Sequence, residues 1–322
     1  MPNTKASIAE NAPEGQNAIE ARNLTKIYAP QGGGAPKHAL KGIDLDIPRG
    51  SIFGLLGPNG AGKSTFINIL AGLVKKTSGT ARIWGFDIDK NPRKSRVSIG
   101  VVPQELNIDP FFTPYDLLDL HAGMYGVPKA ERRTAEILEA LGLTDKAQAY
   151  ARTLSGGMRR RLLVAKAMVH SPPILVLDEP TAGVDVELRQ QLWDYVRTLN
   201  AHGATIVLTT HYLEEAEAMC GRIAIINHGA VIACEPTPQL LARISDKRLV
   251  IRPAQPLAAV PAALAGLNAE RLRDGALAVQ YNPADTPVMM LIGRIRDAGI
   301  EIADISTEES DLEDVFLQLT AK

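Results

Sequence analysis

One stretch, Gly57 to Ser64 with the sequence GPNGAGKS, constrains the fold of this chain more than any other. It follows a short apolar segment, SIFGLLG, and precedes the helix-like segment TFINILAGL. The stretch matches the phosphate-binding loop pattern, in which glycines let backbone N–H groups approach a phosphate and a lysine neutralises its charge. A loop of this kind between a buried strand and a helix predicts a nucleotide-binding domain of the α/β class.

The side chains of this loop suit different parts of a nucleotide. Lys63 is expected to neutralise the β- and γ-phosphates, and the Ser64 hydroxyl is expected to be a Mg²⁺ ligand. The alternative, a glycine-rich turn that carries a lysine by chance, fits the flanking strand and helix less well. We therefore expect the nucleotide to be bound by a continuous run of residues: Gly57, Pro58, Asn59, Gly60, Ala61, Gly62, Lys63, Ser64 and Thr65.

A second segment, ILVLDEP at residues 174–180, supplies an apolar strand that ends in two adjacent carboxylates. The first, Asp178, is the expected ligand of Mg²⁺ and its water shell. The second, Glu179, can orient and deprotonate the water that attacks the γ-phosphate, a role worth about 10² to 10⁴ in rate. The alternative for Glu179 is a solvated charge at the end of a strand. The order Asp-Glu-Pro-Thr directly after a buried strand favours the catalytic role.

The stretch LSGGMRRRLLVAK, Leu154 to Lys166, contains no histidine, cysteine or carboxylate, so it offers no group that could move a proton or hold a metal ion. Two glycines after a serine at the start of a helix suit the approach of backbone N–H groups to an anion. The following arginines, Arg159, Arg160 and Arg161, allow two interpretations, a nucleic-acid patch or a solvated helix face. On a nearly neutral protein we favour the solvated face.

Composition places the chain among proteins with a mixed-charge surface. The 35 Lys and Arg residues against 36 Asp and Glu residues give a net charge of -1, which argues against a dedicated nucleic-acid binder. The two cysteines, Cys220 and Cys234, have no spacing typical of a metal site or a disulfide framework, so we expect a reducing compartment. No apolar run approaches the roughly 18 residues needed to cross a bilayer, and the N-terminus lacks a signal-peptide core. We expect a soluble, cytoplasmic protein.

The pattern along the chain predicts two domains behind a short tail. Residues 1–17 lack periodicity and are expected to form a disordered tail. Residues 18–238 hold every nucleotide motif, with apolar strands on both sides of a helical segment at about 107–170. Residues 239–322 alternate strand-like and helix-like segments, with the first helix expected at AVPAALAGL, residues 259–267. This alternation indicates a small C-terminal α+β domain.

Taken together and in order, these motifs resemble the ATP-binding cassette family over about residues 18–236. The resemblance rests on GPNGAGKS, ILVLDEP and LSGGM, and on four further elements: Tyr28, Gln104 in VVPQE, Asp185 in AGVD and His211 after IVLTT. It implies that Tyr28 stacks on adenine, that Gln104 contacts Mg²⁺ or the attacking water, and that His211 contacts the γ-phosphate. Taken alone, each of these three has a plain alternative: a core aromatic, a turn residue and a helix cap, respectively.

The resemblance also implies a fold and an assembly. The fold is a P-loop cassette, a RecA-like α/β core with an antiparallel β subdomain and an α-helical subdomain. Ser155, Gly156 and Gly157 would bind the γ-phosphate of ATP held with Mg²⁺ on the loop of a second copy, and Asp185 would also contact nucleotide. The chain would then be a head-to-tail homodimer joined by ATP. Met158 stands where the family usually has Gln, a departure that affects side-chain contacts only.

Two further features, LSGGMRRRL and the ending EESDLEDVFLQLTAK, resemble the branch of the family that serves ABC-2-type exporters. This branch implies an ATPase whose dimer closure drives a separately encoded integral-membrane permease. It implies a peripheral location on the cytoplasmic face of the inner membrane. Cargo would be contacted only by the permease, and nucleic acid would not be a partner.

Two other functions compete with transport. Cassettes that act on nucleic acid or the ribosome carry long coiled-coil or zinc insertions or a second fused cassette, and this sequence has none of them. The other competitor is a non-catalytic nucleotide sensor. Against it, the sequence keeps the full set of reactive side chains: Lys63, Asp178, Glu179 and His211.

Overall fold

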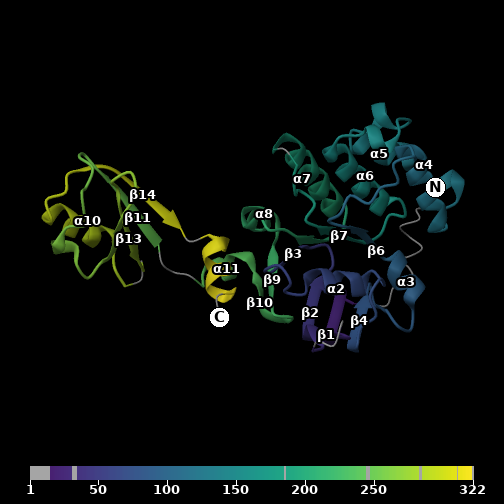
Figure 1. Cartoon of the computed structure of the whole chain (residues 1–322), viewed down its shortest axis with the longest axis horizontal. Helices are drawn as coiled ribbons and strands as arrows, with labels where there is room; N and C mark the ends of the chain where they lie inside the picture. The colour runs from purple at the N-terminus through teal and green to yellow at the C-terminus, as the bar shows by residue number, and fades with distance from the viewer. Residues whose placement is uncertain are drawn as a thin grey trace. The chain divides into compact units, whose positions relative to one another are not determined.

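The structure, a computed structural model of the whole chain, describes residues 15–30, 35–184, 186–243, 247–282, 285–309 and 311–320. The chain divides into two compact units, with the boundary in the sequence between Thr237 and Pro238 (Figure 1). Most of the expected tail, residues 1–14, lies outside the described residues. Its last residue, Asn17, already belongs to the first strand, so the tail is shorter at that end than predicted.

A six-stranded sheet forms the centre of the first unit, in the order β10-β9-β3-β8-β7-β6. Its strands are β3 (Ile52–Leu56), β6 (Ile99–Val102), β7 (Ile174–Asp178), β8 (Thr205–Thr209), β9 (Arg222–Asn227) and β10 (Ala230–Pro236). All neighbours pair in parallel except β10, which runs antiparallel to β9 at the edge. Every residue of β7 and β8 is buried, as expected for apolar strands covered on both faces.

Helices follow the parallel strands and cover the sheet. They are α2 (Lys63–Leu70), α6 (Gly156–Met168), α7 (Val186–Ala201) and α8 (Leu213–Met219). Figure 1 shows α4 (Pro114–Met124), α5 (Thr134–Ala140) and α6 on one side of this sheet. On the other side it shows α2 with β1 (Asn17–Tyr28), β2 (Lys37–Pro48) and β4 (Ser78–Ile83). The connections place the loops that leave the parallel strands at one edge of the sheet, which is where ligands bind in sheets of this type.

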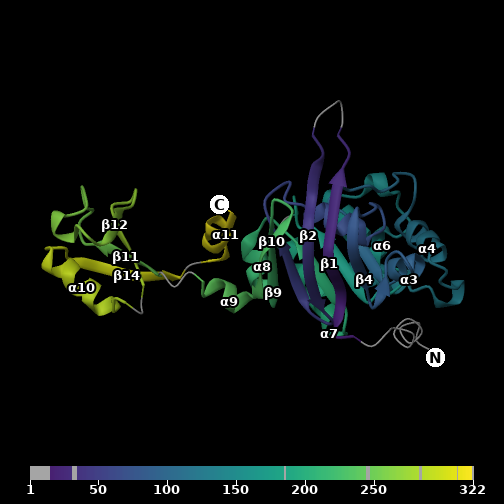
Figure 2. The ribbon, with the colours of Figure 1, turned by 90° about the horizontal axis from the view of Figure 1, so that it is seen from below.

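A second, antiparallel sheet has the order β2-β1-β4-β5. Its strands are β1 (Asn17–Tyr28), β2 (Lys37–Pro48), β4 (Ser78–Ile83) and β5 (Phe86–Asp87), followed by the short helix α3 (Pro92–Val97). Figure 2 shows β1 and β2 side by side as a long hairpin. The apolar residues that alternate along β1 and β2 pack in one core cluster with β3 and α2, so this sheet is part of the first unit.

The helical segment holds α4 (Pro114–Met124), α5 (Thr134–Ala140) and three 3₁₀ turns at Lys129–Glu131, Thr144–Lys146 and Ala151–Thr153, and it ends with α6. Thr113 begins α4 because its hydroxyl accepts a hydrogen bond from the Asp116 amide at 3.1 Å, and Pro114 follows at the first helical position. In the part of the chain that the structure describes, no helix has both the length and the apolar character that a membrane crossing requires.

The second unit is a four-stranded antiparallel sheet, β12-β13-β11-β14, packed on one helix. Its elements are α9 (Thr237–Leu241), β11 (Lys247–Pro253), β12 (Asn268–Arg271), β13 (Leu277–Tyr281), α10 (Val288–Asp297), β14 (Ile302–Glu309) and α11 (Leu312–Thr320). The helix predicted over residues 259–267 was wrong: only a 3₁₀ turn forms, at Ala262–Leu264. Pro261 and Gly266, with φ of +97°, bracket the turn, and β12 follows in place of a continued helix.

Three aromatic side chains contact one another where α4 lies beside the connection between α6 and β7. The rings of Tyr125 and His170 are parallel with centroids 3.7 Å apart, and His121 meets Tyr125 edge-on at 5.3 Å. His170 is only 5% exposed. Burial lowers the pKa of His170 to about 4, and burial likewise lowers the pKa of His121 to about 4. The folded chain therefore disfavours a charged imidazole at either place.

We expect acid to destabilise the fold through this stack, and His170→Phe to remove part of that effect. The folded pKa of about 4 lies below the ordinary 6.5, so the unfolded chain takes up the proton first as pH falls. The penalty is absent above pH 6.5 and grows between pH 6.5 and 4, reaching about 2 kcal/mol at pH 5. Urea unfolding measured at neutral pH and at pH 5 should show that the free energy of unfolding falls less in the variant than in the wild type. The phenylalanine keeps a ring stacked on Tyr125, so the packing is preserved. An equal fall in the free energy of unfolding in both proteins would show that His170 is not a source of the acid sensitivity.

Candidate nucleotide site

The candidate site lies where four parallel strands end. In β6, β7, β8 and β3, neighbouring strands pair in register, with Val102 opposite Leu177 and Asp178 opposite Thr209. The segments that leave these strands carry the predicted groups: Gln104 after β6, Asp178 and Glu179 at the end of β7, His211 after β8, and the loop at residues 57–62 after β3. The topology therefore gathers side chains that lie far apart in the sequence.

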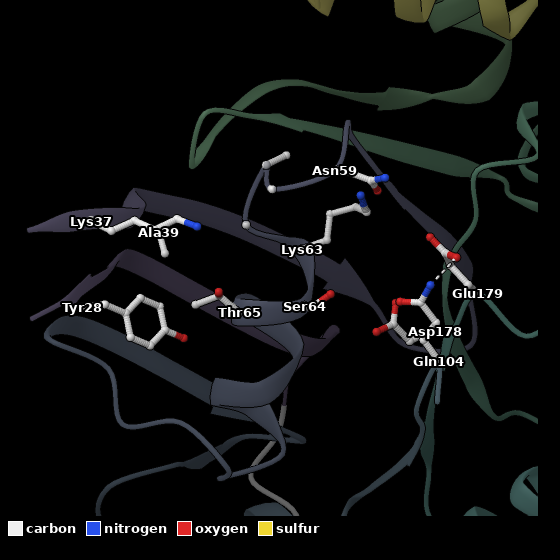
Figure 3. A pocket seen from close by; sticks show the side chains of 13 residues that line it. Tyr28, Lys37, Ala39, Asn59, Lys63, Ser64, Thr65, Gln104, Asp178 and Glu179 are labelled. Atoms are coloured by element: carbon white, nitrogen blue, oxygen red, sulfur yellow. Dashed lines mark hydrogen bonds between the residues drawn. The ribbon is translucent and has the colours of Figure 1, made fainter. Parts of the chain in front are cut away.

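One pocket at this edge holds most of the predicted residues. Its lining is Tyr28, Lys37, Ala39, Asn59, Gly60, Ala61, Gly62, Lys63, Ser64, Thr65, Gln104, Asp178 and Glu179. Figure 3 shows Tyr28 on one side of the pocket and the two carboxylates with Gln104 on the other, with Lys63 and Ser64 between them. An elongated ligand with an aromatic end and an anionic end matches this layout.

Two lining residues on β2, Lys37 and Ala39, were not predicted from the sequence. Lys37 pairs with Tyr28 across the β1–β2 hairpin. The hairpin predicted from the sequence was the available signal. A residue paired with Tyr28 on the neighbouring strand lies close to any ligand that contacts Tyr28. Lys37 adds a second cation to the pocket.

Two glycines let the loop after β3 adopt its path. A Cβ at Gly57 would lie 2.2 Å from the Ile226 carbonyl oxygen, so no side chain fits there. Gly62 has φ of +115°, and a Cβ there would lie 2.6 Å from the Ala39 carbonyl oxygen. The backbone can therefore pass close to its neighbours and curl around a small ligand group only with glycine at both positions.

The loop and the start of α2 present unpaired donors to the pocket. The amides of Lys63, Ser64 and Thr65 donate to no acceptor among the residues described, as expected for the first turn of a helix. The Lys63 ammonium donates to the carbonyl oxygens of Gly57 at 2.6 Å and Pro58 at 3.2 Å. An anion here would meet a helix N-terminus and a cation together, which fits a phosphate chain.

The electrostatics of Lys63 depend on the carboxylates opposite. Its side chain is buried, and burial lowers its pKa, while Glu179 and Asp178 act in the opposite sense. The charged form of a buried ammonium requires such partners. A phosphate ligand would strengthen this support.

The two carboxylates differ in environment. Asp178 is buried and accepts a hydrogen bond from the Thr209 hydroxyl at 2.5 Å. Burial raises its pKa, and the Thr209 bond lowers it. Glu179 has a left-handed backbone, with φ of +49°, a conformation that costs free energy in a residue with a side chain and is enriched at functional sites. One Glu179 oxygen accepts a hydrogen bond from Gln104 Nε2 at 2.9 Å and lies 3.4 Å from His211 Nδ1.

Three oxygen-bearing groups in the pocket suit Mg²⁺: the hydroxyl of Ser64, the carboxylate of Asp178 and the amide of Gln104. Mg²⁺ prefers oxygen ligands, and it is usually held by one or two carboxylates together with water and substrate phosphates. Within the described ranges, no group of three or more His, Cys, Asp and Glu side chains could hold a metal ion. The oxygen atoms of Ser64, Asp178 and Gln104 fit an ion whose other ligands are water and the phosphates of a nucleotide.

The interpretation of the arginines on α6 as a solvated face was wrong. Arg160 is 5% exposed, and its guanidinium donates to the carbonyl oxygens of Pro103 at 3.1 Å and Gln104 at 2.8 Å. Arg161 is half-buried and donates to the Leu141 carbonyl oxygen at 2.6 Å. Arg160 shares its helix face with the buried residue three positions on, Leu163, so Arg160 lies in the protein interior, while Arg159 and Arg161 are half-buried.

A buried carboxylate, Glu215, was also missed. It accepts hydrogen bonds from the hydroxyls of Thr181 at 2.9 Å and Thr210 at 3.1 Å, and it lies 3.4 Å from Arg189 Nε. It therefore ties the segment after β7 to the segment that carries His211. Its partners come from three separate stretches of sequence, so no local pattern marks it.

The Ser155 segment lies outside the pocket. Ser155 caps α6, with its hydroxyl accepting from the Met158 amide at 3.3 Å. Ser155 and Gly156 are exposed, and a Cβ at Gly156 would meet nothing within 4 Å. This helix N-terminus thus faces open space rather than the chain's own Lys63 loop. The remaining predicted residue, Asp185, lies outside the described residues.

Comparison with known proteins decides the family. The ABC transporter family model matches residues 40–182. The linearmycin resistance ATP-binding protein LnrL of Bacillus subtilis (strain 168) is 35% identical over 94% of this chain and 98% of its own length. The chain belongs to the ABC transporter family. The daunorubicin/doxorubicin resistance ATP-binding protein DrrA of Streptomyces peucetius is 37% identical over 94% of this ABC chain and 92% of its own.

A solved structure supports the same assignment for the cassette. A dimeric, post-hydrolysis state of the ATP-binding cassette MJ0796, bound to ADP and phosphate, superposes with a TM-score of 0.62 at 29% identity, covering 68% of this chain and 98% of that one. The predicted cassette fold is confirmed. As an ABC ATP-binding subunit, the chain binds ATP with Mg²⁺, hydrolyses ATP, and works as a dimer with a membrane permease.

Proposed function

We propose that this ABC subunit powers an exporter whose permease is of the ABC-2 type. The observation that carries the proposal is the length of the match: the resistance proteins LnrL and DrrA align over 94% of the chain, so the likeness includes the C-terminal unit and not the cassette alone. The branch-specific LSGGMRRRL and LEDVFLQL stretches support the same permease type. Closure of the ATP-bound dimer would drive the permease, a separate chain.

Within the site, the groups take roles that follow from their positions. Lys63 and the loop amides hold the β- and γ-phosphates, and Tyr28 stacks on adenine at the other end of the pocket. Ser64 and Asp178 would hold Mg²⁺, which neutralises charge that develops on the phosphates. Glu179 accepts the proton of the attacking water, and Gln104 and His211 each contact one of its carboxylate oxygens. By family resemblance, Gln104 would also contact Mg²⁺ or the attacking water, and His211 would contact the γ-phosphate.

The exposed N-terminus of α6 serves the second copy. Ser155, Gly156 and Gly157 offer a hydroxyl, backbone amides and about half a positive charge from the helix dipole. The exposure of Ser155 and Gly156, and the absence of all three residues from the lining of the chain's own pocket, support a ligand on the partner's loop. Asp185 is assigned a contact with nucleotide by family resemblance alone.

The remaining assignments concern the whole chain. Residues 18–238 are the ATP-binding domain, and residues 239–322 are an accessory domain that supports the dimer without chemistry of its own. The subunit lies on the cytoplasmic face of the inner membrane, held there by its permease. Cargo touches the permease alone, and nucleic acid is not a partner, in line with a net charge of -1.

Co-purification tests the transport role. A tagged full-length chain, isolated from detergent-solubilised membranes of its own cells, is expected to bring down a separately encoded protein with about six apolar spans of roughly 20 residues each. The Lys63→Ala variant serves as the control for contacts that depend on nucleotide. Recovery of ribosomes or nucleic acid, with no polytopic membrane protein, would favour the competing class of cassette and overturn the proposal.

A further inference from the structure

We propose that Arg160 is a positioning residue that fastens the Gln104 segment to α6 and thereby holds the Gln104 amide against Glu179. This inference rests on the proposed roles of Gln104 and Glu179. The chain of contacts is continuous: the Arg160 guanidinium donates to the Gln104 carbonyl oxygen at 2.8 Å, and Gln104 Nε2 donates to Glu179 at 2.9 Å.

Because Arg160 is buried, loss of its hydrogen bonds to the Pro103 and Gln104 carbonyl oxygens would leave these groups without a donor among the residues described. The side chain is 5% exposed, and both carbonyl oxygens that it contacts, those of Pro103 and Gln104, belong to the segment that follows β6. That segment has no regular secondary structure from Pro103 to Thr113, so no ladder of backbone hydrogen bonds fixes it. A charged donor that bridges two successive carbonyls supplies the missing restraint.

The neighbouring charges explain how a guanidinium is tolerated at this depth. Burial lowers the pKa of Arg160, while Glu179 and Asp178 act to raise it. The carboxylates of the site therefore stabilise Arg160 in its charged form, and Arg160 in turn offsets part of the repulsion between two adjacent negative charges. An uncharged side chain of similar length would fill the space without either effect.

Arg161 provides a matched control on the same helix. It is half-buried rather than fully buried, and it likewise donates to main-chain carbonyl oxygens, but these belong to Leu141 and Gly142, after α5. Loss of either arginine leaves carbonyl groups short of a donor, so both changes are expected to lower the unfolding temperature. Only the loss of Arg160 releases Gln104.

A double-mutant cycle on the purified full-length chain tests the inference with Mg-ATP. Arg160→Met is expected to lower kcat about tenfold while the Kd for ATP changes less than about threefold, and Arg160→Lys should recover part of the rate. In a Gln104→Ala background, the same Arg160→Met change should lower kcat less than about threefold, because its effect passes through Gln104. Arg161→Met should have the same effect on kcat in both backgrounds.

The results distinguish a failure of the role of Arg160 from a failure of the role of Gln104. If Gln104→Ala lowers kcat but Arg160→Met still lowers it tenfold further, Arg160 does not act through Gln104 and the inference is overturned. If Gln104→Ala leaves kcat unchanged, the proposed role of Gln104 fails first and the inference fails with it. Should Arg160→Met not fold, Arg160→Lys takes its place in the cycle, because it keeps the charge but its side chain is one atom shorter than the arginine whose Nη1 contacts both carbonyl oxygens.

Discussion

Replacing Glu179 with glutamine is expected to reduce ATP hydrolysis by about 10² to 10⁴ while ATP binding is retained. Glutamine has the same shape and can still accept the hydrogen bond from Gln104, but it cannot take a proton from water. The loss of one negative charge also removes an influence that raises the pKa of Asp178, although burial still raises that pKa in the variant. Bound ATP that cannot turn over should accumulate a stable dimer, seen by size-exclusion chromatography with Mg-ATP.

A neighbouring carboxylate offers the control for this experiment. Glu214 lies three residues after His211, is exposed, and lines no part of the pocket. Glu214→Gln removes the same charge from the protein and should keep wild-type turnover. Wild-type turnover in Glu179→Gln would show that another group activates the water.

A mixed dimer of two inactive variants is expected to hold ATP at one of its two sites. Ser155→Arg fills the open space at the start of α6 and removes the cap on the Met158 amide, whereas Lys63→Ala damages the chain's own phosphate loop. In the mixed dimer, one site combines an intact Lys63 from one chain with an intact Ser155 from the other. The second site carries both faults.

Two different affinity tags allow the mixed dimer to be isolated and its trapped nucleotide counted. We expect about one ATP per mixed dimer and none in either single-variant dimer, since every site in those dimers carries a fault. Met158→Gln tests the flank of the same helix and should change the rate less than tenfold, about 1 kcal/mol or less. A verified mixed dimer that traps no ATP would show that the site is not shared between chains.

Local sequence patterns accounted for much of the first unit. The GPNGAGKS loop and the ILVLDEP strand were recognisable because their properties depend on near neighbours: glycines where Cβ atoms would clash, and an unbroken apolar run where both faces of a strand are covered. The family and the ATPase activity expected from them are confirmed. The roles of single residues such as Gln104 and Asp185 stay predictions.

Errors arose where a local pattern has two physical solutions. The segment at 259–267 has helix-forming composition, but Pro261 and Gly266 limit it to one 3₁₀ turn and the chain continues into β12. The basic run on α6 matches a solvated face equally well as a buried one, because sequence spacing does not show what packs against a helix. The structure decides for burial at Arg160.

By itself the sequence determined that this chain carries a phosphate loop, a pair of carboxylates at a strand end and a serine-glycine helix start, because each of these needs only a few consecutive residues. Only the tertiary structure decided which distant groups meet. Parallel pairing of β6, β7 and β8 brings Gln104, Glu179 and His211 together. The packing of α6 places the Arg160 guanidinium within hydrogen-bond distance of the Gln104 carbonyl oxygen. Such contacts depend on strand order and on which helix faces are covered, and both are set by the packing of the whole unit.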